Sequence, residues 1–482
     1  MLQICKELFE KWNNAEIIYC HWKSNEHLMP GLDGKTDLDV LLSKNCETSA
    51  YKILDELSFL HCKSQYGSRY PGVTDWLGFD QQTGRMIHLH LHFQIVTGHR
   101  GMKEYNLPWS DLALKTRIKD KNTGVYMMEP NLEIVTLYSR MALKADIKKR
   151  HNASKGVYKT GSDTMQEIDY LKKYVSYSKV NNLLIQYYPK EAQDFLTLIK
   201  KDNLSAEDFM QLITIVTHAM QPYSRYHHFI LCLLEWYYPI ALHIRSVCKK
   251  RFEIITRKTP IQGLVVAFIG QDGAGKSTVT NEIEKWLLWK LDAHRYYLGS
   301  GDHYHSWQKS IQKSLPERKG VFLSTFSAFL SLTKYNRLAK DVLKSIKNAE
   351  KYRNKGGFAL FDRYPQTQFL GINDGPKIRH MMKKTKNRLL LMIMALFAKS
   401  EENCLKNAEK ISPDIVFKLI LPPEESLRRK PHEDFEKIKR KHEIIKSLSF
   451  SNSKVYEIDA TMNYEDELIL IKQIIWQNIP KS

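Results

Sequence analysis

Residues 264–278 read LVVAFIGQDGAGKST, and this run constrains the fold more than any other part of the chain. An apolar stretch ends abruptly at Gly270, which is typical of a buried strand that enters a tight turn. Residues 270–277 then follow the spacing G-x-x-x-x-G-K-[ST] without a gap. A helical pattern continues from Ser277 to Leu287. The run therefore predicts a strand, a glycine-rich loop and a helix in direct succession.

A loop of this kind can hold the phosphates of ATP. Phosphate oxygens need several converging backbone N–H donors, and glycines let the chain curl without side chains in the way. The N-terminus of the next helix directs positive partial charge to the same place. Lys276 would reach the β- and γ-phosphates, and the Ser277 hydroxyl would bind Mg²⁺. The residues predicted to bind ATP are Gly270, Gly273, Ala274, Gly275, Lys276, Ser277 and Thr278.

The length of 482 residues is too great for a single hydrophobic core, so we expect three regions. Residues 1–130 mix strand and helix patterns, as in an α+β domain, and residues 131–255 are helical. In residues 256–482, short apolar runs alternate with helical stretches, which predicts an α/β domain with a parallel sheet and helices on both faces. The strands expected there are Leu264–Ile269, Arg295–Leu298, Phe358–Phe361, Asp414–Leu421 and Lys454–Ile458.

Charge and composition narrow the range of partners. The formal net charge of +20 favours anionic ligands, but the lysines are spread out and no recognition motif is present, so we expect no nucleic-acid partner. We expect the most apolar stretch, Phe229–His243, to be a buried packing helix, with a helix on a membrane surface as the alternative. The cysteines form no C-x-x-C pair and the N-terminus lacks a signal-peptide core, so we expect a cytoplasmic protein.

Charged residues follow two of the predicted strands. Asp362 and Arg363 come directly after Phe358–Phe361, at the end of a strand that should face the ligand crevice of an open parallel sheet. An aspartate there can hold Mg²⁺, and an arginine can bind an acceptor phosphate through two hydrogen bonds. Arg428 and Arg429 follow Asp414–Leu421 and could close over a phosphoryl group in transfer.

Together these motifs resemble the thymidylate kinase-like branch of P-loop kinases over residues 260–482. The loop GQDGAGKST is close to that family's GxDGxGKST, FDRYP at 361–365 matches its DR[YF] motif, and LPPEESLRR at 421–429 matches its lid segment. The resemblance implies that Asp272 lies near the acceptor, that Arg363 binds the acceptor phosphate, and that Arg429 is the lid arginine. The predicted catalytic residues are Asp272, Lys276, Asp362, Arg363, Arg428 and Arg429.

The chain departs from that family in residues 302–354, where the family's nucleobase pocket would lie. This long segment begins with the aromatic sequence HYHSW at 303–307, and the arginine and glutamine that read the base have no clear counterparts. The motifs thus predict phosphoryl transfer without indicating thymidylate as the acceptor. The arrangement resembles thymidylate kinase-like proteins associated with surface polysaccharide synthesis.

The N-terminal region carries a second candidate site. Asp37 and Asp39 lie two residues apart in a predicted strand, so both carboxylates should point to one face and could hold a metal ion with a nucleoside triphosphate. The sequence HWKS ends at Ser24, and with the D-x-D strand it resembles the nucleotidyltransferase pattern, except that Lys23 replaces a glycine. The resemblance implies a nucleotidyltransferase-like fold for this region, nearest its uncharacterised members.

The third carboxylate of that pattern should come from the strand that reads IHLHLH at 87–92, where His88 stands in its place. Imidazole is a poor ligand for Mg²⁺ and a better one for transition metals. Three interpretations stay open: a transferase with altered metal chemistry, a nucleotide-binding relic, or a zinc or manganese site formed by the histidines. The candidate metal ligands of the chain are Ser277 and Asp362 in one region, and Asp37, Asp39, His88 and His90 in the other.

The leading functional hypothesis is a Mg²⁺- and ATP-dependent phosphotransferase. The γ-phosphate would move to a phosphate or hydroxyl group of a nucleotide or sugar-type acceptor. A second hypothesis is nucleotidyl transfer at Asp37 and Asp39, alone or in a bifunctional enzyme. A third is a peripheral-membrane scaffold that docks the kinase region near lipid-linked sugars.

Overall fold

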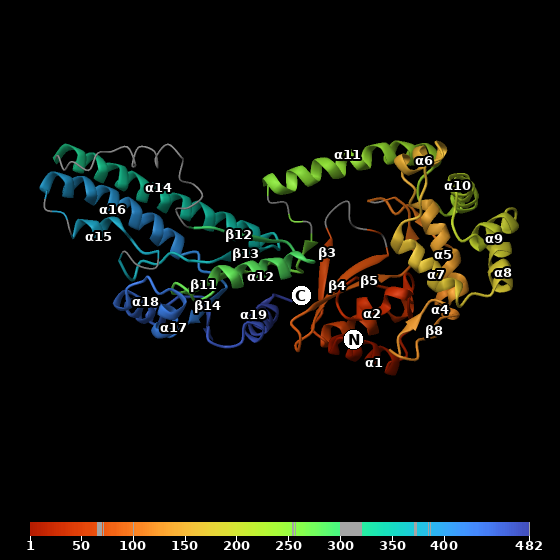
Figure 1. Cartoon of the computed structure of the whole chain (residues 1–482), viewed down its shortest axis with the longest axis horizontal. Helices are drawn as coiled ribbons and strands as arrows, with labels where there is room; N and C mark the ends of the chain where they lie inside the picture. Colours follow the sequence, from red (N-terminus) through yellow and green to blue (C-terminus); the bar gives the residue numbers. More distant parts are fainter. Residues whose placement is uncertain are drawn as a thin grey trace. The chain divides into compact units, whose positions relative to one another are not determined.

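A computed structural model describes residues 1–64, 70, 72–99, 101–252, 255, 257–298, 321–370, 374–383, 385 and 387–481 of the chain (Figure 1). The chain divides into two compact units, Met1–Ile254 and Ile255–Ser482. Residues 302–320, which include the aromatic sequence HYHSW, lie outside the described residues. Within the part of the chain that the structure describes, no helix is long and apolar enough to cross a bilayer.

The first unit contains a mixed sheet and a group of helices. Within this unit the strands are ordered β3-β4-β5-β2-β1-β9-β8, and β2 pairs parallel to β5 while β4 pairs antiparallel to it. The strands are β1 Tyr19–His21, β2 Leu38–Leu42, β3 Leu60–Ser64, β4 Val73–Phe79, β5 Met86–His92, β6 Val96–Thr97, β7 Tyr105–Asn106, β8 Ile118–Lys119 and β9 Tyr126–Met127. The helices are α1 Gln3–Asn14, α2 Leu28–Leu32, α3 Glu47–Glu56, α4 Ser110–Lys115, α5 Pro130–Leu143, α6 Ile147–Ser154, α7 Ser162–Lys172, α8 Tyr177–Tyr187, α9 Ala192–Lys200, α10 Ala206–Met220 and α11 His228–Phe252.

The hairpin of β4 and β5 sets the geometry of the N-terminal site. Its turn spans Gln81–Gly84, and the Asp80 side chain accepts hydrogen bonds from the backbone N–H and the hydroxyl of Thr83. In the resulting register, His90 of β5 lies opposite Asp75 of β4 on one side and Asp39 of β2 on the other. Because side chains alternate between the two faces of a sheet, these three residues share one face.

The helical part of the first unit is built around α5. Nearly every residue of α5 is buried, and its apolar side chains share one core cluster with those of α8, α9 and α10. Glu129 is the N-cap of this helix, and its carboxylate accepts hydrogen bonds from the backbone N–H groups of Asn131 and Leu132. Trp22 and Leu41, from the sheet side, belong to the same cluster. A continuous core therefore joins the sheet to the helices within this unit.

Helix α11 corrects the expectation of a buried packing helix. Its inner side packs on the first unit through Leu231 and Glu235, and Glu235 forms ion pairs with Arg150 and His99. Several large apolar side chains on other sides of the helix are exposed: Phe229, Ile230, Leu233, Trp236, Tyr237, Ile240, Ile244 and Val247. The apolar composition continues around the helix, but only one stripe meets the rest of the unit, so composition alone overestimates its burial.

The second unit contains a parallel sheet with strand order β12-β13-β11-β14-β15. The strands are β10 Arg257–Lys258, β11 Val265–Gly270, β12 Ala293–Tyr296, β13 Phe358–Phe361, β14 Ile415–Ile420 and β15 Lys454–Asp459. The helices are α12 Lys276–Leu288, α14 Val321–Asn354, α15 Ile378–Met382, α16 Arg388–Glu409, α17 Pro423–Arg429, α18 Phe435–Ser447 and α19 Tyr464–Asn478. All five strands predicted for this region are confirmed to within about two residues at their ends.

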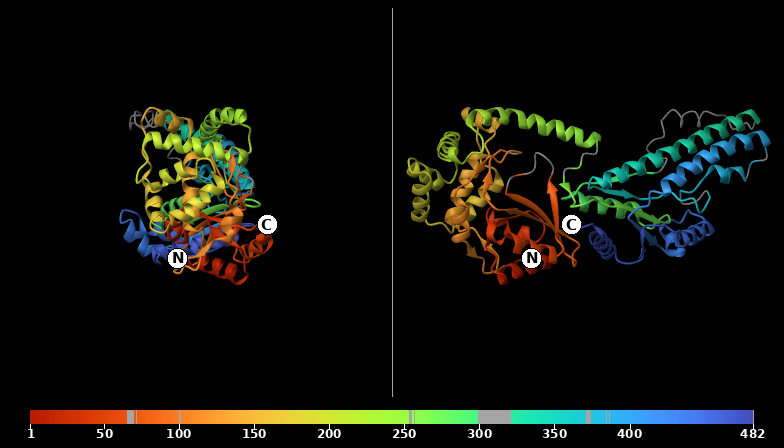
Figure 2. Two further views of the ribbon diagram at one scale, coloured as in Figure 1. Left: turned by 90° about the vertical axis from the view of Figure 1, so that its right-hand side faces the viewer. Right: turned by 180° about the vertical axis from the view of Figure 1, so that it is seen from behind.

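Helices cover both faces of this sheet. Val265, Ala267 and Ile269 of β11 belong to one core cluster with apolar residues of α14, α16 and α18. Val266 and Phe268 point to the opposite face and are also fully buried, and α12 packs on β11, β12 and β13. The long helices α14 and α16 lie side by side (Figures 1 and 2). The α/β architecture expected for this region is therefore confirmed.

Candidate functional site

The glycine-rich loop joins β11 to α12 at the carboxyl end of the sheet. Gly273 and Gly275 have φ values of 85° and 83°, a left-handed conformation that side-chain-bearing residues adopt at a cost. Gly275 is the N-cap of α12, so the first N–H groups of a helix of 13 residues point toward the loop. The loop and the helix N-terminus thus form a concave set of backbone donors, which suits phosphate oxygens.

Lys276 lies at the mouth of this loop. Its Nζ donates hydrogen bonds to the carbonyl oxygens of Gly270 and Gln271, each at 2.8 Å. Burial lowers the pKa of the ammonium group from its usual value, and nearby Arg363 lowers it further, while Asp272 opposes the shift. The charge is therefore held over the loop by main-chain oxygens, within reach of any anion bound there.

Ser277 and Asp362 meet beside the loop, as expected for two ligands of one cation. The Ser277 hydroxyl donates to Oδ2 of Asp362 at 3.5 Å, although the two residues are 85 positions apart. Asp362 is only 7% exposed, and its Oδ1 atom is buried without a hydrogen-bond partner among the described residues. A buried carboxylate oxygen without a donor is costly unless a cation or water satisfies it. The pair therefore fits Mg²⁺, a cation that binds oxygen ligands.

Arg363 follows Asp362 directly after the end of β13. Its guanidinium lies 3.9 Å from Asp374 and 5.8 Å from the centre of the Tyr297 ring, and its side chain is 42% exposed. Burial raises the pKa of Asp374, and the positive charge of Arg363 opposes that shift. A neighbouring pocket, lined in part by Tyr335, Asp374 and Glu401, has a volume of about 30 Å³. That space holds about one water molecule, far less than a nucleoside or a sugar requires.

The two arginines of α17 are placed differently. Arg429 donates to the carbonyl oxygens of Gly273 and Ala460, so its guanidinium lies against the phosphate loop. Arg428 is 77% exposed and forms two hydrogen bonds with Glu425 one turn earlier on the same helix. Only Arg429 is therefore in contact with the loop. The sequence analysis named Arg429 alone as the counterpart of the lid arginine, but it included both arginines among the predicted catalytic residues.

Two residues of α18 were missed by the sequence analysis. Lys441 forms an ion pair with Asp272, and this pairing lowers the pKa of the Asp272 carboxyl even though partial burial would raise it. His442 lies 3.3 Å from Oε1 of Gln271. Both residues sit in a basic helical stretch, and no local motif distinguishes them from the solvent-facing lysines and arginines around them.

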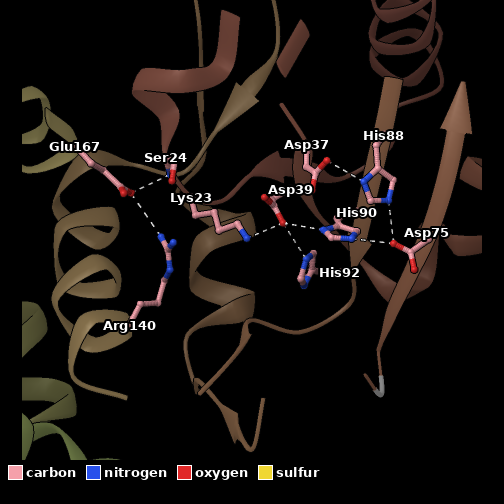
Figure 3. A network of polar contacts seen from close by, with 10 residues as sticks. All are labelled: Lys23, Ser24, Asp37, Asp39, Asp75, His88, His90, His92, Arg140 and Glu167. Atoms are coloured by element: carbon pink, nitrogen blue, oxygen red, sulfur yellow. Dashed lines mark hydrogen bonds and ion pairs between the residues drawn. The ribbon is translucent and has the colours of Figure 1, made fainter. Parts of the chain in front are cut away.

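The N-terminal site is an alternating series of carboxylates and imidazoles (Figure 3). His88 lies between Asp37 and Asp75, at 2.9 Å and 3.0 Å. His90 lies between Asp75 and Asp39, at 2.8 Å and 3.4 Å. The site brings together all four residues predicted there, Asp37, Asp39, His88 and His90. It also contains Asp75, which the sequence analysis did not connect to the site.

Lys23 and His92 complete the surroundings of Asp39. The Lys23 ammonium lies 2.8 Å from Oδ1 of Asp39, and Nε2 of His92 lies 3.3 Å from the same oxygen. Burial would raise the pKa of Asp39, but the charge of Lys23 and contacts with His90 and His92 hold it well below its usual range. Burial lowers the pKa of His92 to about 3, so this imidazole is neutral near pH 7. The lysine that replaces the glycine of the resembling motif thus directly neutralises one carboxylate of the D-x-D pair.

The same unit contains a large cavity whose lining includes several lysines. The cavity has a volume of about 930 Å³, and Lys103, Lys144, Lys148 and Lys149 line part of it. Burial, with Lys23 nearby, lowers the pKa of Lys103 to about 8, while Asp39 and Asp75 oppose that shift. The lining also contains two carboxylates, those of Asp146 and Glu235, together with apolar and aromatic side chains, so the cavity has a mixed character.

Two curated proteins match part of this chain in sequence. The chain is 24% identical over 226 residues to the uncharacterized ATP-binding protein YghR of Escherichia coli strain K12, covering 43% of this chain and 84% of that protein. It is 26% identical over 219 residues to the uncharacterized ATP-binding protein YghS of the same strain. This match covers 43% of this chain and 89% of that protein. No protein-family model matches the chain.

Solved structures of deoxyadenosine kinase from M. mycoides are also similar to part of the chain. The structure with bound dCTP shares 18% identity and covers 44% of this chain and 98% of the kinase, with a TM-score of 0.27. The structure with bound dATP shares 18% identity and covers 44% of this chain and 99% of the kinase, with a TM-score of 0.28.

Proposed function

We propose that the second unit is an ATP-dependent phosphotransferase of the thymidylate kinase-like type. The observation that carries this proposal is the meeting of Lys276, Ser277 and Asp362 around the backbone donors of the glycine-rich loop. Similarity to two proteins described as ATP-binding supports ATP as the donor. The loop would hold the triphosphate, and Mg²⁺ at Ser277 and Asp362 would neutralise charge on its oxygens.

The chain's own residues then have distinct tasks. Backbone N–H groups from Gly273 to Ser277 orient the β- and γ-phosphates, and the Lys276 ammonium stabilises negative charge on the γ-phosphoryl oxygens as the bond to the leaving oxygen breaks. Arg363 directs its exposed guanidinium to an acceptor phosphate or hydroxyl. Arg429 lies close enough to the loop to turn toward the transferring group. The acceptor that fits these parts is a nucleotide or a sugar-type molecule, including intermediates of surface polysaccharide synthesis.

A second candidate function, nucleotidyl transfer, is favoured by the cavity of the first unit, because Lys103 in its lining interacts electrostatically with Asp39. The metal it implies is Mg²⁺, and the residues do not fit that ion well. Asp39 is already paired with Lys23, and imidazoles occupy the space between the carboxylates. We therefore assign no step of such a reaction to Mg²⁺ at this site.

The products distinguish the two reactions. We expect the full-length protein, incubated with γ-labelled ATP, Mg²⁺ and a panel of nucleotides, sugars and sugar phosphates, to release ADP and transfer the label to one acceptor class. Nucleotidyl transfer would instead release labelled pyrophosphate. The measurement is chromatographic separation of the labelled products. Pyrophosphate as the sole labelled product, or no consumption of ATP with any acceptor, would remove the basis for the phosphotransferase.

The exposed side of α11 favours a third candidate, contact with a membrane surface. Trp236 and Tyr237 are 69% and 58% exposed, and aromatic side chains of this kind settle at lipid headgroups. We expect the protein to co-sediment with anionic phospholipid vesicles, more strongly at low than at high salt, because positive charge assists binding and salt screens it. The double variant Trp236→Ser and Tyr237→Ser should bind several-fold less, whereas Tyr174→Ser, at an exposed tyrosine of the same unit, should bind normally. Equal sedimentation of the original protein, the double variant and Tyr174→Ser would contradict membrane contact through α11.

A further inference from the structure

A cavity of about 420 Å³ lies among α5, α6, α7 and α10 of the first unit. This volume is within the range of about 300–1,000 Å³ that is typical of small-molecule sites. Among the described residues that line it, the charged groups are one carboxylate, Glu167, and four basic side chains, Arg140, Lys144, Lys149 and Lys159. Lys144 and Lys149 also border the larger cavity of this unit, so the two spaces adjoin. The lining of the smaller cavity therefore has an excess of basic groups.

The carboxylate of this lining interacts with Arg140 (Figure 3). Oε1 of Glu167 lies 3.5 Å from Nη1 of Arg140 and accepts a hydrogen bond from the backbone N–H of Ser24 at 3.0 Å. Glu133 is also near Arg140, but burial raises the pKa of the Glu133 carboxyl to about 8, so this group carries little negative charge at pH 7. Arg140 is 9% exposed, and its Nε atom has no hydrogen-bond partner among the described residues. The protein therefore satisfies this guanidinium only in part.

The three lysines of the lining have no carboxylate partner of their own. Among the described residues, the side-chain nitrogens of Lys144, Lys149 and Lys159 form no hydrogen bond or ion pair. The carboxylate of Asp146, which is close in sequence, caps α6 by accepting from the backbone N–H of Lys149 at 2.7 Å. The amino groups of these lysines are therefore available to a ligand.

Like charges lie close together around Lys144. Its pKa lies well below the usual value, first because of the charge of Arg140, and then because of burial and the charges of Lys23 and Lys103. Asp39 opposes this shift, but Lys23 already lies 2.8 Å from the Asp39 carboxylate. An anion bound beside Lys144 would relieve the repulsion and favour the charged form of its amino group.

Helix α7 presents its N-terminus to the same cavity. Gly161 is the N-cap of this helix of 11 residues, and both Gly161 and Thr164 of the first turn line the cavity. No side chain caps the helix, so its first backbone N–H groups lack a capping acceptor. These donors and the positive end of the helix dipole suit a phosphate group.

The cavity also offers apolar surface. Tyr158 and Phe209 stack on each other with their ring centres 3.9 Å apart, and both border the cavity together with Leu137 and Met141. A ligand that contacts both the basic groups and these side chains has a charged part and a less polar organic part.

We propose that this cavity binds a phosphate-bearing small molecule. The N–H groups at the start of α7 and the lysines of the lining hold the phosphate, and Tyr158 and Phe209 contact the organic part. Nucleotides and sugar phosphates share this chemistry. The site is separate from the phosphate loop of the second unit, and its existence does not depend on phosphotransferase activity.

Calorimetric titration of the full-length protein tests the cavity. The protein carries Lys276→Ala, which weakens competing binding at the phosphate loop, and the probes are nucleoside monophosphates, hexose 1-phosphates and inorganic phosphate. We expect about one organic phosphate per chain, bound more tightly than inorganic phosphate because of the apolar contacts. Preference for a nucleoside monophosphate identifies a nucleotide site, and preference for a hexose 1-phosphate identifies a sugar phosphate site. No binding of any probe would overturn the proposal.

Two lysines of the lining provide the first variant. Lys144→Ser combined with Lys159→Ser should weaken binding about 10-fold or more, because contacts between an ammonium and a phosphate are charged hydrogen bonds. Lys179→Ser combined with Lys190→Ser, at exposed positions of the same unit away from the cavity, is the matched control and should bind normally.

Gly161→Asp tests the N-terminus of α7 without removing a packed side chain. A Cβ atom at position 161 meets no atom within 4 Å, and aspartate is a favourable N-cap, so the thermal midpoint should be unchanged or higher. Its carboxylate would occupy the free N–H groups and repel the phosphate, so binding should weaken about 10-fold or more. Unchanged affinity in this variant would overturn the placement of the phosphate at α7.

Discussion

Lys276→Ala should abolish ATP turnover while the protein remains folded. The ammonium group is held over the loop by the carbonyl oxygens of Gly270 and Gln271. In the proposed reaction it would meet the charge that develops on the γ-phosphoryl oxygens. Removing a preorganised cationic donor of this kind lowers kcat/KM by about 10²- to 10³-fold or more. The measurement is ADP release by the full-length protein with the acceptor that the screen identifies, together with calorimetric titration of ATP in the presence of Mg²⁺.

The same substitution elsewhere on α12 provides the control. Lys285 is 63% exposed and pairs with Glu282 on the same helix, so Lys285→Ala removes an equal charge at a distance from the loop. We expect this variant to retain turnover, because an exposed ion pair contributes only about 0–1 kcal/mol to stability and nothing to the loop. Normal turnover in folded Lys276→Ala would contradict the assignment of the loop as the ATP site.

Asp362→Asn should lower phosphoryl transfer by about 10²-fold or more and raise the Mg²⁺ concentration needed for half-maximal rate. One oxygen of Asp362 accepts from Ser277, and the other is buried without a donor among the described residues. Under the proposed function, the carboxylate charge would therefore serve the cation rather than the fold. For the same reason the variant should be at least as stable as the original protein, since a buried charge is removed.

Opposite effects on rate and on thermal midpoint would distinguish a metal ligand from a structural residue. Asp466→Asn, at an exposed position in the first turn of α19, is the matched control and should leave both the rate and the Mg²⁺ dependence unchanged. If Asp362→Asn has the Mg²⁺ dependence of the original protein, the metal is held elsewhere. A lower thermal midpoint together with an unchanged rate would make Asp362 a structural residue.

Local sequence patterns predicted the second unit well for a physical reason. Strands of a parallel sheet are buried on both faces, so each appears as a short continuous apolar run, such as Phe358–Phe361, between polar turns. The phosphate loop depends on main-chain conformation that glycine at 273 and 275 permits, and such a requirement is visible in the residue types themselves. The ends of β11 and β13 then bring Ser277 and Asp362 together, because strand ends in a parallel sheet lie at one edge.

Other features required knowledge of which segments pack together. The sequence analysis included both Arg428 and Arg429 among the catalytic residues, but the rotation of about 100° between successive helix residues turns only Arg429 toward the loop. Helix α11 was predicted as a helix, but the side that packs on the first unit depends on Arg150 and His99, which lie far away in sequence. Lys441 reaches Asp272 from a different helix, and no spacing in the sequence records that contact.

The N-terminal site shows most clearly which features the sequence predicts and which depend on tertiary structure. The residue types and their alternation predicted that Asp37 and Asp39 share a face, and that three histidines share a face of their own strand, because side chains of a strand alternate. The register of β4 and β5 decides that Asp75 lies between His88 and His90. The register of β2 and β5 and the turn after β1 decide that Lys23 neutralises Asp39. Sequence determines which groups a strand can present on one side, whereas tertiary pairing decides which groups from other strands they meet, because the register is set by contacts along the whole length of neighbouring strands.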